Sequence, residues 1–111
     1  MANKKQKALK SRMRETVYEM AKGLYDAQVI DAKTMREYEA MCAPPVEDLS
    51  PADIKRIRLH EKVSQAVFAR LLNTSVSTVR QWEQGEKHPR GIALKLLNLV
   101  LHKGISLLIE V

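Results

Sequence analysis

The sequence predicts an all-α protein, a small helical bundle preceded by an N-terminal helical extension. Apolar residues recur every three or four positions in successive segments, which is the spacing of one helix face. Ser or Asp residues suited to cap a helix precede several of these segments, and Asn or Gly residues follow several of them. The chain has 111 residues, 45% hydrophobic and 29% charged. This length allows one small domain and an appendage.

The first candidate helix spans about Ala8 to Asp26. Its apolar residues recur at helical spacing and are Met13, Val17, Met20 and Leu24. Residues 1–7 are polar, and we expect them to be mobile.

The second candidate helix follows Asp31, which is placed to cap it, and continues to about Met41. One face of this helix carries Met35, Tyr38 and Cys42. Pro44-Pro45 then enforces an extended segment and marks a boundary. We therefore predict an N-terminal helical extension over residues 1–48 and a second domain over residues 49–111.

The second domain is expected to begin with a helix that ends at His60. Ser50 is placed to cap it, Pro51 suits its first turn, and the carboxylate of Asp53 interacts favourably with the helix dipole. The predicted core face holds Ile54 and Ile57, with Leu59 as a further candidate.

Residues 64–85 predict two short helices joined by a tight turn. Ser64 caps the first, whose buried stripe consists of Phe68, Ala69 and Leu72. Ala69 is small enough for the second helix to cross closely over it. Asn73 ends the first helix, because Asn tolerates the left-handed backbone of a three-residue turn.

The second of these helices is capped by Ser75 and ended by Gly85. Val79 and Trp82 are expected to point inward together with Thr74. The residues that remain on the outer face are Val76, Ser77, Arg80, Gln81 and Gln84.

This outer face suits the reading of bases in the major groove of DNA. A valine such as Val76 fits a thymine methyl group, and Gln81 can bond adenine bidentately. Ser77 can bond several base edges, and Arg80 can reach a guanine or a phosphate. The alternative is a solvated helix face, which is the commoner fate of such residues.

A loop over residues 86–90 leads to a strongly helical segment from Gly91 to Lys103, which Gly104 ends. The apolar residues of this segment are Ala93, Leu94, Leu97, Val100 and Leu101. Residues 105–111 fit either a last helix or a short strand. Their apolar side chains suit either a homodimer surface or ordinary core packing, and they are Ile105, Leu107, Leu108 and Ile109.

The two short helices resemble the helix-turn-helix of the Xre family, which includes lambdoid phage repressors and Cro. The matching residues are Ser64-Gln65, Phe68-Ala69, Asn73, Ser75, Thr78-Val79, Trp82-Glu83, Gly85 and Pro89. The resemblance covers most of residues 50–100 and implies a lambda-repressor-like fold. Asn73 and Lys62 stand where this family usually has Gly.

By this resemblance, Gln65 bonds a phosphate from the start of its helix. The family's base-reading positions correspond to Val76, Ser77 and Gln81, which Ser75 and Arg80 flank. Arg58 and Glu83 correspond to a pair that would lock the first helix of the domain to the recognition helix through a fork-shaped, charge-assisted bond. The alternative is two independent surface charges of little energetic value.

The charge of the chain is basic, with a net value of +6 and a pI near 9.6. Residues 50–111 contain ten Lys and Arg and five Asp and Glu, a balance of +5. Such a balance suits a polyanionic partner. Lys87 and Arg90 follow the recognition helix as candidate phosphate contacts, with a solvated basic loop as the alternative. Residues 1–14 contain six Lys and Arg and no acid, which predicts a mobile, solvated segment, with weak attraction to DNA as the alternative.

A second resemblance extends to the N-terminal part. Residues 29–42, followed by Pro44-Pro45-Val46, are similar to HigA-type antitoxins and their NadS-like relatives. Such proteins bind a RelE-fold toxin, an mRNA interferase, and repress the operon that encodes both. The resemblance implies three partners: double-stranded operator DNA, a second copy of the chain and a RelE/HigB-like toxin. Residues 8–42 would bind the toxin, or else cover the DNA-binding core.

Other chemistry is not indicated. Cys42 is the only cysteine, which precludes a disulfide within the chain and fits a reducing compartment. We find neither a signal peptide nor an apolar run that could cross a membrane, and expect a protein of the bacterial cytoplasm that joins the nucleoid when bound to DNA. The three histidines lack a metal-ligand spacing, and no Gly-rich phosphate loop occurs. We expect no catalysis, metal or cofactor.

The leading hypothesis is therefore a sequence-specific repressor that is also an antitoxin. One alternative is a stand-alone Xre-family regulator without a toxin, in which the N-terminal extension serves dimerisation. Another is an interaction module that has lost specific DNA binding, or an RNA binder. The complete polar face of residues 75–84 argues against such a loss, and the absence of aromatic residues exposed on a sheet argues against common RNA platforms.

Overall fold

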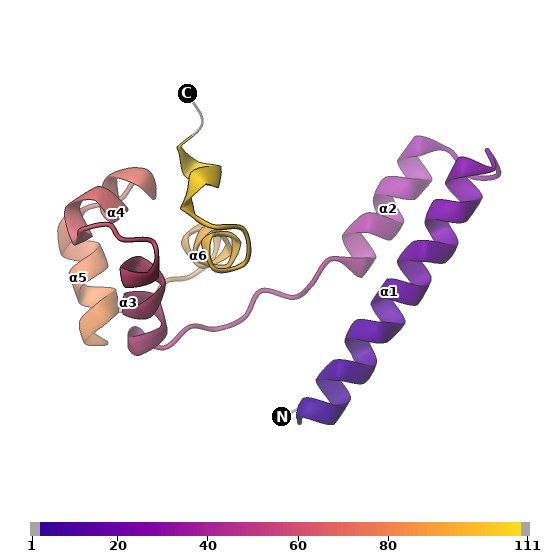
Figure 1. Ribbon diagram of the computed structural model, residues 1–111. Helices are drawn as coiled ribbons and strands as arrows, with labels where there is room; N and C mark the ends of the chain where they lie inside the picture. Colours follow the sequence, from indigo (N-terminus) through magenta and orange to yellow (C-terminus); the bar gives the residue numbers. More distant parts are fainter. Residues whose placement is uncertain (1–2, 110–111) are drawn as a thin grey trace. The chain divides into compact units, whose positions relative to one another are not determined.

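Residues 3–109 are described by a computed structural model, in which they fold into six α-helices and one 3₁₀-helix without any β-strand. The all-α prediction is confirmed. The elements are α1 Lys4–Asp26, α2 Ala32–Cys42, α3 Pro51–His60, α4 Gln65–Leu71, α5 Val76–Gln84, α6 Ile92–Lys103 and the 3₁₀-helix η1 Ile105–Leu108 (Figure 1). They form two compact units, one up to Pro45 and one from Val46.

Helix α1 begins four residues earlier than the spacing of apolar residues predicts. The Asn3 side chain accepts a hydrogen bond from the backbone N–H of Gln6 at 2.8 Å, and the Gln6 side chain accepts one from the backbone N–H of Asn3 at 3.2 Å. This capping box satisfies two donors that would otherwise be free at the helix start. The expectations that residues 1–7 and the basic segment 1–14 are mobile are therefore wrong for residues 3–14, while residues 1–2 lie outside the described part.

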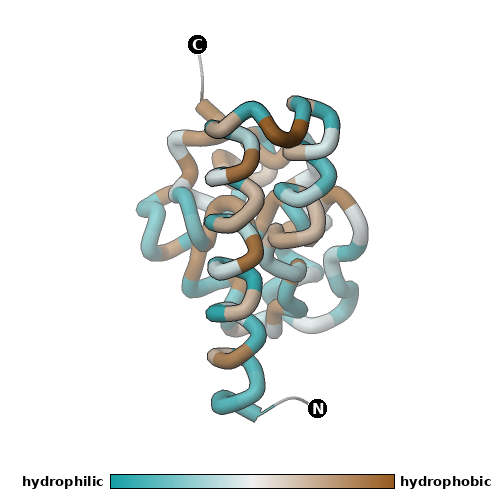
Figure 2. Tube along the Cα trace, turned by 90° about the vertical axis from the view of Figure 1, so that its right-hand side faces the viewer, coloured by the Kyte–Doolittle hydropathy of each residue, from teal (hydrophilic) through white to brown (hydrophobic). Residues whose placement is uncertain are grey.

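The first unit is a hairpin in which α2 packs antiparallel to α1 (Figure 1). Helix α2 has 11 residues and α1 has 23, so α2 covers only part of the length of α1. Of the hairpin's described apolar residues, Ala21 and Met35 alone are buried. The apolar residues that recur along α1 (brown in Figure 2) are largely exposed, with Met13 and Met20 at 58% and 64%.

The four serine and aspartate caps expected from the sequence are confirmed. The side chains of these residues accept hydrogen bonds from backbone N–H groups three positions later, at 2.8–3.1 Å. Ser50 and Asp53 form a full capping box. The caps are Asp31 at α2, Ser50 at α3, Ser64 at α4 and Ser75 at α5.

Three helices end on a residue other than Gly in the left-handed backbone region. Gln28 follows α1, Lys62 follows α3 and Asn73 follows α4, with φ angles of 63°, 60° and 57°. Each turn has the paired bonds of a Schellman motif, for example Thr74 N–H to the Ala69 carbonyl at 2.9 Å and Asn73 N–H to the Arg70 carbonyl at 3.1 Å. A β-carbon in this region costs about 1 kcal/mol, and less for Asn.

Replacing Lys62 with Gly should therefore stabilise the second unit. We expect a gain of about 0.5–1 kcal/mol in the free energy of unfolding, because relief of the left-handed strain outweighs the extra freedom of Gly in the unfolded chain. The measurement is the midpoint of urea unfolding. Asn73→Gly is the matched comparison, and its gain should be smaller. A lower midpoint for Lys62→Gly would contradict this account of the turn.

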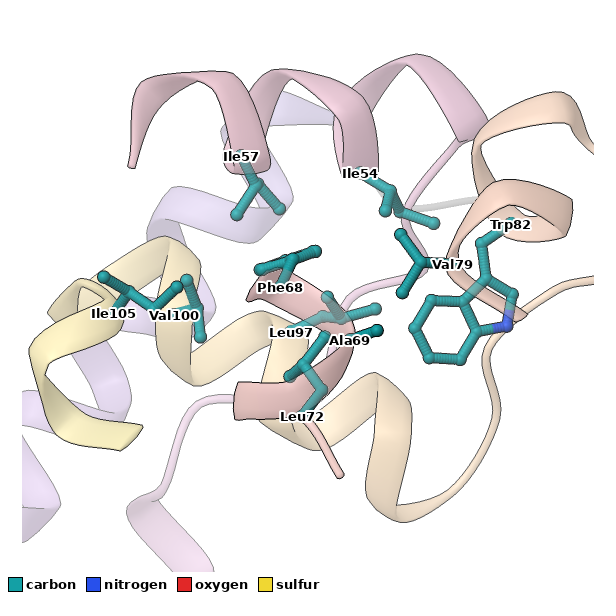
Figure 3. Packing of buried hydrophobic residues seen from close by; sticks show 10 residues of the cluster. All are labelled: Ile54, Ile57, Phe68, Ala69, Leu72, Val79, Trp82, Leu97, Val100 and Ile105. Carbon is teal, nitrogen blue, oxygen red and sulfur yellow. The ribbon is translucent and has the colours of Figure 1, made fainter. Parts of the chain in front are cut away.

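The second unit has a continuous apolar core to which each of its helices contributes (Figure 3). Its residues are Ile54, Ile57, Phe68, Ala69, Leu72, Val79, Trp82, Leu97, Val100 and Ile105. Leu59 does not face this core and is 56% exposed, because it lies two positions beyond Ile57 and thus on the opposite side of α3. Leu101 is likewise exposed, one position after the buried Val100.

Residues 105–108 form the 3₁₀-helix η1, which answers the question of helix or strand in favour of a helix for this part. Ile105 is buried and Leu108 is partly buried against the core, whereas Leu107 and Ile109 are exposed. Glu61 fixes η1 to the end of α3, since its Oε1 accepts a hydrogen bond from the backbone N–H of Ile105 at 3.0 Å.

Asn98 is a buried polar residue beside this core and ties the segment before α3 to α6. Its Oδ1 accepts a hydrogen bond from the Glu47 backbone N–H, and its Nδ2 donates to the Glu47 and Leu94 carbonyl oxygens, all at 2.9 Å. Every polar atom of the amide is thus used, which is what makes its burial tolerable.

Candidate nucleic-acid interface

Helix α5 has an inner face that packs against the core and an outer face that is directed to solvent. Val79 and Trp82 are buried in the core, and Thr74 at its start is half-buried. Along the outer face Val76, Ser77, Arg80 and Gln84 are exposed and Gln81 is half-buried. The helix thus presents a mixed polar and apolar face of the kind that fits into a major groove.

Gly85 ends this helix at a φ of 79°, and the chain then turns back on the helix end. The Gln81 carbonyl oxygen accepts hydrogen bonds from the backbone N–H groups of Glu86 and Lys87, at 2.9 and 3.3 Å. Pro89 is buried, while Lys87 and Arg90 on either side of it are exposed. The loop is thus anchored through its backbone and Pro89, and its two cations extend into solvent.

The Ser75 hydroxyl is committed to the helix start. Its Oγ accepts a hydrogen bond from the Thr78 backbone N–H at 3.1 Å and lies 2.8 Å from the Thr78 Oγ1. Ser75 was expected beside the base-reading residues. The structure shows it in the capping role, with the residue itself exposed at the edge of the outer face.

Arg58 and Glu83 form a two-pronged ion pair between α3 and α5. Nε of Arg58 donates to Oε2 of Glu83 at 2.7 Å, and Nη2 donates to Oε1 at 3.0 Å. The side chains are only 11% and 4% exposed. Nη1 of Arg58 also donates to the Val63 carbonyl oxygen at 3.1 Å, which fixes the turn between α3 and α4. This geometry matches the lock described above rather than two independent surface charges.

Gln65 joins this pair. Its Nε2 donates to Oε1 of Glu83 at 3.3 Å, so the first residue of α4 is connected to the end of α5. Sequence reasoning placed Gln65 at the DNA but gave no sign of this bond. The residues lie 18 positions apart in sequence, and only the crossing of the two helices brings them together.

The environment of the pair shifts both ionisation equilibria. Burial raises the pKa of Glu83, but the hydrogen bonds from Arg58 and Gln65 and the nearby positive charges outweigh this effect, so the pKa lies below its ordinary value. The hydrogen bond to Glu83 raises the pKa of Arg58 against the opposing effect of burial. Both residues therefore stay charged near neutral pH.

This shift predicts a pH-dependent difference between the wild type and Arg58→Ala. In the variant, Glu83 loses the hydrogen bond and the charge of Arg58, so burial has a larger share and its pKa lies higher than in the wild type. Acid therefore protonates Glu83 more readily in the variant and removes the unpaired charge. The difference in unfolding free energy should therefore shrink from pH 7 to pH 4 in urea titrations. A constant difference would contradict the pairing.

Comparison with known proteins agrees with this architecture. The helix-turn-helix family model HTH_3 matches residues 54–108, which include the two short helices and the core around them. Residues 54–108 are a helix-turn-helix domain of the Xre family. The recognition helix of this Xre domain is α5, and α4 is the helix that precedes it.

One curated relative is the antitoxin HigA-2 of Vibrio cholerae serotype O1. It is 49% identical over 53 residues, a match that covers 48% of this chain and 51% of HigA-2. The match thus spans about half the length of this relative. In residues 3–109, no helix combines the length and the apolar character needed to cross a lipid bilayer.

Proposed function

We propose that this chain is a sequence-specific DNA-binding repressor and the antitoxin of a HigBA-like system in the bacterial cytoplasm, where it represses its own operon. The observation that carries the DNA-binding part is the outer face of α5, held rigidly by the core and by the Arg58–Glu83 pair. The similarity to the antitoxin HigA-2 supports the antitoxin part.

Base reading is assigned to Val76, Ser77 and Gln81, with Arg80 beside them on the outer face of α5. Val76 contacts a thymine methyl group, and Gln81 pairs with an adenine. Phosphate contacts come from Lys87 and Arg90 in the loop after α5, and from Gln65 at the start of α4. Ser75 flanks the base-reading residues at the start of α5. These assignments follow from exposure, side-chain chemistry and the family resemblance.

The experiment that tests base reading compares Gln81→Ala with Lys87→Ala on the operator and on single-base variants of it. Gln81→Ala should cost roughly 1–3 kcal/mol and relax the preference at one base position. Lys87→Ala should weaken binding about equally on every sequence and lower the salt slope by about 1. Equal weakening on all sequences by Gln81→Ala would make Gln81 a phosphate contact instead.

Operator binding by this domain requires two copies, because two-fold related recognition helices read half-sites about one helical turn apart. We assign the contact between copies to the exposed apolar residues Leu101 of α6 and Leu107 and Ile109 of the C-terminal segment. Ile105 is excluded from this surface because it belongs to the core of its own chain.

Toxin binding is assigned to the N-terminal hairpin. The apolar stripe of α1 is not covered by α2, and a hairpin with two buried apolar residues has little core of its own. Flexible methionines on an amphipathic helix suit an adaptable partner surface. The second candidate function is a stand-alone regulator without a toxin, in which the hairpin serves dimerisation and the same stripe contacts a second copy of the chain.

A further inference from the structure

The carboxylate of Glu83 lies directly behind the edge of the DNA-facing helix. Val76, Arg80 and Glu83 follow one another at four and three positions, so they lie along one edge of α5. Val76 and Arg80 are exposed, whereas Glu83 is covered by Arg58 and Gln65. Glu83 therefore cannot touch DNA itself, but the Gln65 side chain that covers it borders this edge.

The orientation of the Gln65 amide follows from this contact. A carboxylate only accepts hydrogen bonds, so the NH₂ group of Gln65 must face Glu83. An amide NH₂ group has two donor hydrogens, and the bond to Oε1 of Glu83 at 3.3 Å uses one of them. The second hydrogen is thereby directed away from Glu83 along the same planar group.

We propose that Glu83 is a positioning residue for DNA binding: it holds the Gln65 amide so that the second N–H donates to a phosphate of the DNA backbone. This inference rests on the proposed function. An unpaired carboxylate beside the DNA would repel the phosphate, at a cost in binding free energy. Arg58 removes this cost, because its two-pronged bond neutralises Glu83 at 2.7 and 3.0 Å. Through these hydrogen bonds, Arg58 neutralises Glu83, and Glu83 in turn orients the Gln65 amide for a phosphate contact.

The test measures the affinity of the full chain for a 30-base-pair duplex of mixed sequence, where phosphate contacts dominate. The variants are Gln65→Ala, Glu83→Gln, the double variant, and Glu86→Gln as the matched control. Glu86 is an exposed acid just after α5, so its replacement removes the same charge without touching Gln65. Circular dichroism at the binding temperature establishes that each variant is folded.

Loss of one negative charge should tighten binding for Glu86→Gln. For Glu83→Gln we expect the opposite, a loss of about fivefold, because a hydrogen bond to a charged group disappears. The double variant should bind no more weakly than Gln65→Ala, since the two changes remove the same phosphate contact. The two side-chain NH₂ proton resonances of Gln65 should also move in Glu83→Gln without DNA.

Three outcomes would overturn the proposal. Tighter binding by Glu83→Gln would show that charge alone acts, and additive losses in the double variant would show that the two residues act separately. Unchanged Gln65 NH₂ resonances in Glu83→Gln would show that no bond was lost, and this readout stays valid if that variant is less stable. If the wild-type chain binds no duplex at all, the proposed function fails as well, which distinguishes that failure from the first three.

Discussion

Replacing Arg58 with Ala should lower the melting temperature of the Xre domain by roughly 12–24 °C. The substitution removes the cation that pairs with Glu83, a carboxylate whose side chain is only 4% exposed in the wild type. Breaking a buried pair from one side costs about 3 kcal/mol, because the remaining charge is uncompensated. In a domain of this size each kcal/mol corresponds to about 4–8 °C. The bond that fixes the turn after α3, from Arg58 to the Val63 carbonyl oxygen, is lost as well.

The matched control is Arg56→Ala, on the same helix. Arg56 also pairs with an acid, Asp53 at 3.0 Å, but its side chain is 73% exposed. Exposed pairs contribute at most about 1 kcal/mol. Thermal unfolding followed by circular dichroism should therefore separate the two variants clearly. An unchanged melting temperature for Arg58→Ala, or equal shifts for both variants, would refute the lock between α3 and α5.

Removing residues 1–42 should abolish toxin neutralisation and leave operator binding largely intact. The reason is that the Xre domain has its own core, to which no residue of the hairpin belongs. A narrower change should act in the same way. Met20→Glu places a charge in the middle of the exposed stripe of α1, and burying that charge against a partner should weaken binding at least about a hundredfold.

The control for the stripe is Lys22→Glu, which introduces the same side chain on the same helix outside the stripe. The measurements are growth rescue and co-purification with the toxin encoded beside the chain. A truncated chain that still rescues growth would refute the division of roles between hairpin and domain. If expression from the native operon yields no co-purifying toxin, the stand-alone regulator is favoured.

Local chemistry explains what the sequence could predict. The helix caps at Ser50, Ser64 and Ser75 are decided within four residues, so their pattern is visible in the chain itself. The buried faces of α4 and α5 follow from the spacing of apolar residues. The same reasoning is wrong for Leu59. This residue is close in sequence to the buried stripe of α3 but lies at a different angle around the helix.

Contacts between distant segments explain what could not be predicted. Asn98 meets Glu47 across 51 positions, and Glu61 meets Ile105 across 44. A polar residue gives no sign in the sequence of whether it will find a buried partner. The start of α1 was missed for a different reason, since its Asn3–Gln6 capping box precedes a run of lysines rather than an apolar segment.

The central claim is that α5 reads a specific DNA sequence. The most direct measurement is a mobility shift of the full chain with DNA from immediately upstream of its own coding sequence, with nonspecific competitor and a salt series. The account predicts a shift that resists competitor and is lost in Ser77→Ala/Gln81→Ala. Binding that competitor removes entirely, with the double variant equal to the wild type, would contradict it.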